Sequence, residues 1–171
     1  IITFFVKRRI SYVRSQAELK QKVAETEMQA LRAQMNPHFI FNSLNSIENF
    51  IMQNEKRLAS DYLNKFSRLM RSILDSSKNE MVPFEKDMEA LKLYVELEQL
   101  RFNNKFNYSA QYDPELVNKN YKVPSLLVQP YVENAIIHGF ARIKKTGLHL
   151  DVTAAIKDGY IEYTVKDNGA G

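Results

Sequence analysis

One short run near the first third of the chain constrains the fold more than any other, because it starts a helix and gives it two different faces. Asn36 is a favourable N-cap residue, and Pro37 is well tolerated in the first turn of a helix. Apolar and polar residues then recur at spacings of three and four, each on its own face. The apolar stripe is Ile40, Leu44, Ile47 and Ile51, and the polar stripe is His38, Asn42, Asn45 and Asn49. We therefore expect His38 to face solvent or a second domain, away from the core.

A solvent-facing imidazole is a candidate nucleophile, because its neutral form carries a ring nitrogen lone pair. The alternative is a first-turn histidine without a chemical role. The run Leu31–Asn45, LRAQMNPHFIFNSLN, resembles the phosphoacceptor motif of the LytS-type sensor histidine kinases. This resemblance implies that His38 is the phosphorylated residue. Many other histidine kinases place an acidic residue directly after the histidine, whereas Phe39 follows here; Asn42, one turn on, can form a hydrogen bond but cannot accept the proton as a base.

Composition bounds the class of protein. With 171 residues the chain can form one or two small domains, each with a modest core. The absence of cysteine excludes disulfides and thiolate metal sites. The net charge of +4 is mild, and the basic residues cluster in one place, so we expect no nucleic-acid partner.

The first residues look like the end of a membrane helix. The apolar segment Ile1–Val6 is followed by Lys7, Arg8 and Arg9, and positive charge flanks membrane helices on the cytoplasmic side. Because the segment is too short to span a bilayer and no methionine starts the chain, we expect a fragment of an inner-membrane protein with this portion in the cytoplasm. The alternative is an apolar overhang of a soluble helix.

Residues 10–36 contain no proline or glycine and are rich in helix formers. Their apolar residues keep approximate heptad spacing, interrupted at Gln21, so a loose coiled coil and a single solvated helix are both compatible with this segment. A coiled coil there would carry a signal from the membrane to His38.

Residues 37–103 are predicted to form a helical dimerisation and phosphoacceptor region. After a break at 53–55, apolar residues from Ala59 to Leu74 recur with helical spacing. Two such helices cannot bury both apolar faces alone, and a second copy would complete a four-helix bundle; the resemblance also implies this homodimer. A third helix is predicted over 84–102. Its segment Tyr94–Phe102 resembles the family's connection to the catalytic domain, and we expect its glutamates and arginine to lie on a solvated face with helix-spaced ion pairs.

Residues 104–171 are predicted to be the N-terminal part of an α/β sandwich, which makes the whole chain α+β. Alternating aromatic residues predict a strand over Phe106–Tyr112. A helix is expected to open at Val123–Pro124 and to end at Gly139. Two strands, 147–155 and 160–165, are expected around the turn 157–159.

The run Gln129–Gly139, QPYVENAIIHG, resembles the N box of the ATPase superfamily shared by histidine kinases, Hsp90, gyrase B and MutL, the GHKL superfamily. The resemblance implies that Asn134 binds the Mg²⁺ that bridges the ATP phosphates. His138 lies one turn further on and is expected to reach a phosphate, and Glu133 is a less secure member of the site. Hydrolytic members carry a glutamate four residues before the asparagine, where Pro130 stands here. Because proline cannot accept a proton, the site is poorly equipped to activate water.

The run Asp167–Gly171, DNGAG, resembles the first glycine box of the same superfamily. The resemblance implies that Asp167 accepts a hydrogen bond from the adenine amino group, and that Gly169 and Gly171 let the backbone approach the nucleotide. The alternative is an ordinary turn at the end of a strand. The lid and the second glycine box are absent from this sequence, so we expect the fragment alone to be inactive.

These observations predict a LytS-type sensor histidine kinase that phosphorylates itself on His38 with ATP and Mg²⁺ and then transfers the phosphoryl group to an aspartate of a response regulator. A degenerate, non-catalytic dimerisation scaffold and a GHKL ATPase are the alternatives. His149 lies in a strand without a motif around it, so a structural role is expected for it.

Overall fold

The computed structural model describes residues 37–77, 79–140, 143 and 146–170. The chain divides into two compact units, residues 1–40 and 41–171. The predicted membrane-helix end at 1–9 and the predicted coiled coil at 10–36 lie outside the described residues. No helix in the described part of the chain is both long enough and apolar enough to cross a bilayer.

Two helices, α2 (Pro37–Met52) and α3 (Lys56–Ser76), form the helical hairpin. The break at 53–55 lies where the sequence predicts it, and Asn54 takes a left-handed conformation there, with φ of 63°. The hydroxyl of Tyr62 hydrogen-bonds to Ser43 Oγ at 3.3 Å, and its ring lies 5.8 Å from that of Phe50. The buried side of α2 therefore carries Ser43 and Phe50, one position away from the apolar stripe.

That apolar stripe remains on the surface of the chain. Leu44 is 50% exposed and Ile51 is 59% exposed, whereas Ile40 and Ile47 are half-buried. Helix α3 likewise buries Leu69 and Ile73 but leaves Leu63 49% exposed. Each helix of the hairpin thus has one apolar face covered within the chain and a second one open, as expected if a further helix pair covers it.

Helix α4 (Phe84–Arg101) buries ten of its 18 residues. Its own apolar residues occupy most of its circumference, and a narrow exposed stripe includes Glu85, Glu89 and Lys92. Its buried residues are Phe84, Asp87, Met88, Ala90, Leu91, Leu93, Tyr94, Val95, Leu97 and Glu98. The prediction that the acidic residues near its end are solvated is wrong for Glu98, which is 1% exposed.

A two-stranded ribbon precedes α4: β1 (Met81–Pro83) pairs antiparallel with β3 (Lys122–Pro124). This pairing corrects the predicted helix over 123–139, because Val123 pairs with Val82 and Leu126 has a left-handed φ of 59°. The helix starts only at Gln129, as α6 (Gln129–Asn134), and continues as the π-helix η1 (Ala135–Phe140).

The three-stranded sheet has the order β2-β4-β5. Strand β2 (Phe106–Tyr112) is parallel to β4 (Leu148–Lys157), which is antiparallel to β5 (Tyr160–Asp167). The parallel pair requires a crossover, which contains the short helix α5 (Pro114–Asn118), β3 and α6. The β4–β5 turn is at Asp158–Gly159, both with positive φ (51° and 82°), as a two-residue hairpin needs.

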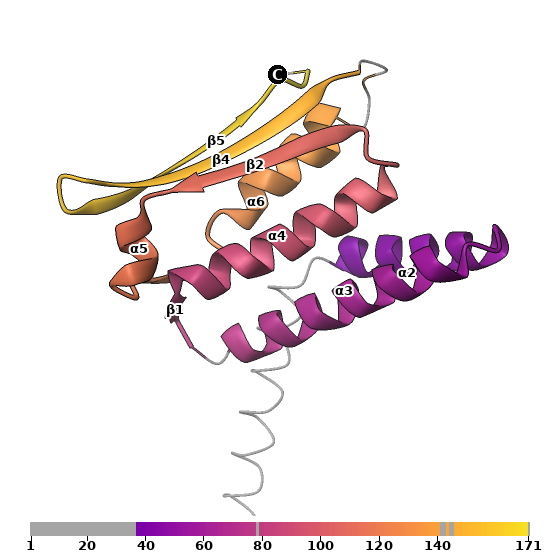
Figure 1. Cartoon of the computed structure of the whole chain (residues 1–171), viewed down its shortest axis with the longest axis horizontal. Coiled ribbons are helices and arrows are strands. Elements are labelled where there is room, and N and C mark those ends of the chain that lie inside the picture. The colour runs from indigo at the N-terminus through magenta and orange to yellow at the C-terminus, as the bar shows by residue number, and fades with distance from the viewer. Residues whose placement is uncertain (1–36, 78, 141–142, 144–145, 171) are drawn as a thin grey trace, which may run out of the picture. The chain divides into compact units, whose positions relative to one another are not determined.

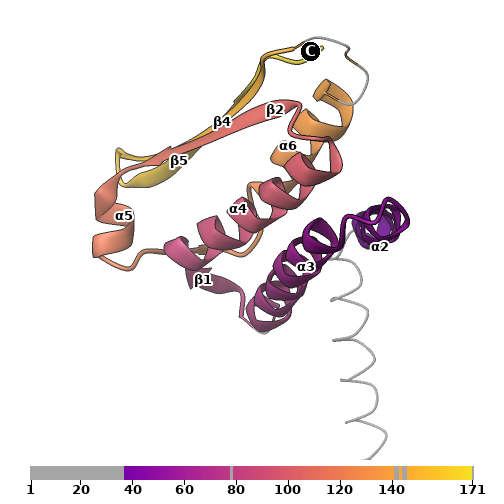
Figure 2. The ribbon, with the colours of Figure 1, turned by 45° about the vertical axis from the view of Figure 1, so that its right-hand side comes forward.

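The elements form layers. Helices α4 and α6 lie side by side on one face of the sheet, and α3 packs against α4 on the side away from the sheet (Figures 1 and 2). Alternate residues of β4 point into this layer and are buried: Leu148, Leu150, Val152 and Ala154. The α+β class expected from the sequence is thus confirmed, whereas the helix predicted over 123–139 is replaced by β3, a turn, α6 and η1.

A core substitution tests this packing. Leu150 is 0% exposed, so Leu150→Ala is expected to lower the free energy of unfolding by about 2–5 kcal/mol. The matched control is Leu127→Ala, because Leu127 is 46% exposed and its truncation is expected to change stability by less than about 1 kcal/mol. Urea denaturation followed by circular dichroism measures both, and equal effects would contradict the packing described here.

Candidate functional site

His38 is the second residue of α2, and its side chain is exposed. The next residue, Phe39, is 6% exposed, so the first turn buries one side chain and presents its neighbour to solvent. Asn42 is half-buried, and its backbone carbonyl accepts a hydrogen bond from Ser46 Oγ at 2.8 Å. The exposure predicted for His38 from the polar stripe is confirmed; its role in phosphorylation stays a prediction.

The residues predicted for the N box lie on α6 and η1. Val132 and Ile136 are completely buried and fix the inner side of this helix. Asn134 and His138 are exposed four residues apart, and Glu133 is half-buried. The π-helical stretch begins directly after Asn134, and such wide turns are frequent at functional sites. The buried side chains of Val132 and Ile136 therefore hold the helix in place, and the polar side chains of Asn134 and His138 face solvent.

The glycine box lies against the end of this helix. The carboxylate of Asp167 accepts the backbone N–H of Gly169 at 2.9 Å, and the N–H of Ala170 is directed to the carbonyl of Gly139 at 3.2 Å. Asp167 is exposed, and Gly171 lies outside the described residues. The fold thus brings the two motifs together, although a loop and two strands separate them along the chain.

The approach between the two motifs leaves no room for side chains. A Cβ atom at Gly169 would lie 2.6 Å from the carbonyl oxygen of Gly139 and 2.8 Å from Asp167 Oδ1. A Cβ at Gly139 would lie 3.1 Å from Asp167 Oδ1. Gly169 is therefore required for this close backbone packing, whereas a Cβ at Gly139 would need only a small shift of the Asp167 side chain.

His149 and Asn168 hold the start of β4 next to the glycine box. The N–H of His149 donates to Asn168 Oδ1 at 2.7 Å, and Asn168 Nδ2 donates to the carbonyl of Gly147 at 3.0 Å. His149 Nε2 lies 2.8 Å from Asp151 Oδ1, which also accepts from Ser109. Hydrogen bonds from Ser109 and then from His149 hold the pKa of the Asp151 carboxyl below its usual value. These contacts agree with a structural role for His149.

The donor types in the two motifs fit Mg·ATP. The described residues contain no group of three or more His, Cys, Asp or Glu side chains that could hold a metal ion. Mg²⁺ keeps most of its waters and often takes only one or two protein ligands, so a single exposed amide oxygen, that of Asn134, is chemically sufficient. His138 can donate to a phosphate oxygen, and the Asp167 carboxylate can accept from an exocyclic amine.

Comparison with known proteins agrees with these observations. Residues 26–106 match the histidine kinase family model. The chain is 34% identical over 157 residues to the sensor protein LytS of Staphylococcus epidermidis and 34% identical over 154 residues to the sensor histidine kinase YpdA of Escherichia coli K12. It is 33% identical over 158 residues to the sensor histidine kinase/phosphatase LytS of Staphylococcus aureus.

The chain is thus similar to the LytS-type histidine kinases over about nine tenths of its own length. The matches cover 90–91% of this chain but 26% of each relative. It therefore spans about a quarter of the length of these relatives.

Two acidic residues of the chain have structural positions that sequence reasoning missed. Asp87 is 5% exposed, and its Oδ1 accepts the N–H of Leu126 at 2.8 Å, which holds the turn before α6. Burial raises the pKa of the Asp87 carboxyl. Glu98 is buried beside Arg101. The signal that could have found both is the almost complete apolar circumference of α4, which leaves little solvated surface for charged residues.

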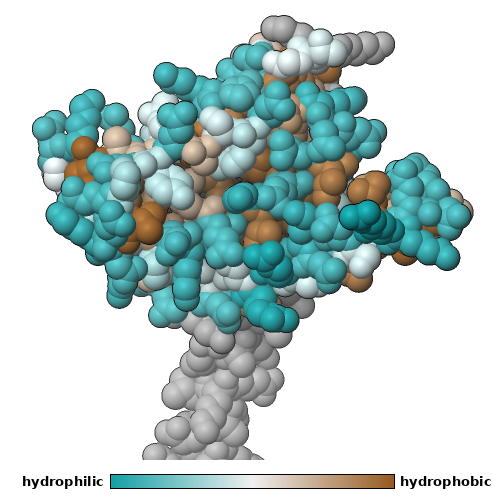
Figure 3. All heavy atoms as spheres, in the orientation of Figure 1, coloured by the Kyte–Doolittle hydropathy of each residue, from teal (hydrophilic) through white to brown (hydrophobic). Residues whose placement is uncertain are grey.

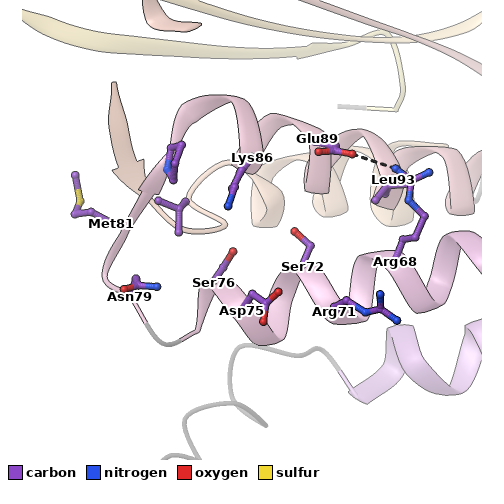
Figure 4. A pocket seen from close by; sticks show the side chains of 12 residues that line it. Arg68, Arg71, Ser72, Asp75, Ser76, Asn79, Met81, Lys86, Glu89 and Leu93 are labelled. Atoms are coloured by element: carbon purple, nitrogen blue, oxygen red, sulfur yellow. Dashed lines mark hydrogen bonds and ion pairs between the residues drawn. The ribbon is translucent and has the colours of Figure 1, made fainter. Parts of the chain in front are cut away.

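A groove lies between the second half of α3 and the first half of α4 (Figure 4). Arg68 and Glu89 form an ion pair across it at 3.0 Å, and Arg71, Asp75 and Lys86 also line it. Its described lining contains none of the predicted site residues. The side chains of both Arg68 and Glu89 are exposed, so this ion pair contributes little to stability.

The glycine packing gives a prediction. Gly169→Ala must displace the backbone at Gly139, at a cost on the order of 1–3 kcal/mol. If this box binds ATP, the substitution is expected to lower the affinity of the intact protein for ATP by roughly tenfold or more. Gly159→Ala is the control: it strains the β4–β5 turn, where φ is +82°, at the opposite end of the hairpin from Asp167, and it is expected to leave the ATP affinity unchanged. Titration with a fluorescent ATP analogue measures both, and an unchanged affinity of Gly169→Ala would contradict nucleotide binding at this box.

Proposed function

We propose that the intact protein is a sensor histidine kinase of a two-component system, which phosphorylates itself on His38 and passes the phosphoryl group to an aspartate of a response regulator. The observation that carries this proposal is the exposed imidazole in the first turn of α2, inside the segment that matches the histidine kinase family.

The proposed step needs little covalent chemistry from the protein. A ring nitrogen of His38 attacks the γ-phosphorus of ATP, a P–N bond forms, and the P–O bond to ADP breaks, with its electron pair leaving on ADP. The ring proton passes to solvent, since Asn42 cannot accept it. Catalysis of such transfers consists mostly of positioning and charge neutralisation.

The residues proposed for the nucleotide are those of the two packed motifs. Asn134 would bind the Mg²⁺, which neutralises phosphate charge when bound, and His138 would donate to a phosphate. Asp167 would accept from the adenine amino group, and Gly169 and Gly171 would leave room for the nucleotide. Support comes from the exposure of Asn134, His138 and Asp167 and from the contact between Gly139 and Gly169. Glu133, half-buried beside Asn134, is kept as a less secure member of the same site.

Pro130 favours a protein acceptor over water. It lies in the first turn of α6, where its missing N–H costs no hydrogen bond, and it offers no group that could deprotonate water. The GHKL ATPase alternative needs such a group. Pro130 therefore supports transfer to His38 rather than to water.

A homodimer is the proposed assembly of the kinase. The open faces of α2 and α3 carry apolar residues at helical spacing, and polar surface over the hairpin is interrupted by apolar side chains in Figure 3. The exposed or half-buried residues of these faces are Leu44, Ile47, Ile51, Leu63, Phe66, Met70 and Leu74. A second hairpin would cover them in a four-helix bundle.

We also propose a role for each part of the chain. Residues 37–103 would serve dimerisation and carry the phosphoacceptor, and residues 104–171 would bind ATP. The region that includes residues 1–9 would attach the protein to the inner membrane, with the described part in the cytoplasm.

Substitution of the acceptor tests the proposed reaction. In the intact kinase, His38→Gln is expected to abolish incorporation of labelled phosphate from ATP while leaving ATP affinity unchanged, because it removes the nucleophile only. His149→Gln is the matched control and is expected to retain incorporation. Acid-labile, base-stable phosphate measured on each protein decides the assignment, and persistent label on His38→Gln would refute it.

The same assay separates the alternatives. A non-catalytic scaffold would show neither phosphohistidine nor ATP turnover, whereas a GHKL ATPase would release inorganic phosphate steadily without phosphohistidine. Either outcome for the wild-type protein would replace the proposed function.

The proposed dimer face gives a further prediction. Leu63→Glu places a charge on the open face of α3 and is expected to shift the protein from dimer to monomer, because burying an unpaired charge is costly. The matched control is Leu127→Glu, at a residue 46% exposed outside the hairpin. Analytical ultracentrifugation measures the assembly, and a Leu63→Glu protein that remains dimeric would contradict this interface.

A further inference from the structure

A buried carboxyl group on α4 holds the turn that precedes the helix of the N box. Asp87 is 5% exposed, and its Oδ1 accepts the backbone N–H of Leu126 at 2.8 Å. The two residues are 39 positions apart in the sequence, so this hydrogen bond joins two separate segments of the chain. Helices α4 and α6 lie side by side (Figures 1 and 2). Asp87 therefore ties the turn before α6 to α4.

The turn itself is strained. Leu126 has a φ of 59°, in the left-handed region that residues with a side chain rarely adopt. Such a conformation persists only where the surrounding structure imposes it, and strained residues of this kind are frequent near functional sites. Asp87 is part of that surrounding structure, because its carboxyl group fixes the direction of the Leu126 N–H. Without this acceptor, we expect the turn to relax toward an ordinary conformation.

The first turn of α4, which carries Asp87, is firmly placed. Phe84 is 0% exposed, and its ring lies 5.3 Å from that of Tyr112 on β2 and 6.2 Å from that of Tyr163 on β5. The N–H of Phe84 donates to the carbonyl of Tyr121 at 2.8 Å, directly before β3. These contacts fix the start of α4 against the sheet, so Asp87 extends from a rigid part of the structure.

The strained turn leads directly into the helix of Asn134. Val128, two residues after Leu126, is the N-cap residue of α6. Its carbonyl accepts the N–H groups of Tyr131 and Val132 at 3.1 and 3.3 Å. Helix α6 has six residues, which is too short for a helix to be stable without contacts to other elements. The conformation of the turn therefore sets the direction of α6 at its start, and with it the position of Asn134.

We propose that Asp87 is a positioning residue for the Mg·ATP site: by holding Leu126 in the left-handed conformation, it fixes the start of α6 and thereby the position of Asn134. This inference rests on the proposed function, in which Asn134 binds the Mg²⁺. Asp87 acts through the backbone of the turn and has no ligand role of its own. The glycine box lies at the other end of this helix, so Asp87 is expected to affect the Mg²⁺-dependent part of nucleotide binding most.

The test uses Asp87→Ala in the intact protein, because alanine removes the acceptor oxygen and is favourable in a helix. The affinity for Mg·ATP, measured with a fluorescent ATP analogue, is expected to fall roughly 10- to 100-fold, as for other residues that orient a metal ligand. In EDTA, without Mg²⁺, the affinity for the same nucleotide is expected to change by less than about threefold, because the glycine box is retained. A general loss of structure would instead lower both affinities.

A second measurement needs no nucleotide. In the native protein the N–H of Leu126 is engaged with Asp87. Its hydrogen exchange and that of the following amides up to Asn134 are therefore expected to become roughly tenfold or more faster in Asp87→Ala. Mass spectrometry of peptides that cover residues 125–134 measures this change.

Two variants serve as controls. Asp87→Asn keeps an acceptor oxygen on a side chain of the same length, so Mg·ATP affinity and exchange are expected to stay within about threefold of the wild type. Glu85→Ala removes an exposed carboxylate from the same turn of α4 and is expected to change neither quantity. If Asp87→Ala does not fold, Asp87→Val, which also lacks an acceptor but leaves a smaller void, takes its place with the same readouts.

A folded Asp87→Ala protein with the wild-type Mg·ATP affinity would overturn this inference, and so would equal losses of affinity with and without Mg²⁺. An Asp87→Asn protein as impaired as Asp87→Ala would also overturn it, because the acceptor oxygen is retained. If the wild-type protein binds no Mg·ATP, the proposed function fails. The exchange measurement then decides the hold on α6 alone: faster exchange over 125–134 in Asp87→Ala than in Glu85→Ala supports it, and equal exchange overturns it.

Discussion

The structure depends on the burial of α4 between the sheet and the hairpin. A helix that is apolar around most of its circumference must be covered on most sides. Helix α3 covers one side, and the sheet and α6 lie on the other. The same constraint explains why Asp87 and Glu98 must each find a specific partner, since a carboxylate in this position has no water to solvate it. Because they are buried, Asp87 and Glu98 form specific contacts, with the N–H of Leu126 and with Arg101, where exposed carboxylates would be hydrated.

The candidate nucleotide site is a consequence of this packing. Helix α6 is held by Val132 and Ile136 on its inner side and by the close approach of Gly139 to Gly169 at its end. Asn134 and His138 lie on its outer side and are exposed. A polar motif on a firmly anchored helix is what a reaction that relies on positioning requires.

Features that depend on local chemistry could be predicted from the sequence. The Asp158–Gly159 hairpin turn follows from the residues that tolerate positive φ, and the exposure of His38 follows from helical spacing. The start of α6 could not be predicted, because the pairing of Val123 with β1 and the hydrogen bond to Leu126 involve partners distant in sequence. The burial of Glu98 was missed for the same reason: a charged residue signals solvent until the neighbouring elements are known.

The central claim is that His38 is the phosphoryl acceptor, and mapping of the phosphate tests it most directly. The intact protein would be incubated with Mg·ATP, digested at neutral or basic pH, and analysed by mass spectrometry with fragmentation that preserves phosphohistidine. This chain contains three histidines. The account predicts phosphate on His38 and none on His138 or His149. Phosphate on either of those residues, or an unmodified His38 in a protein that binds ATP, would contradict it.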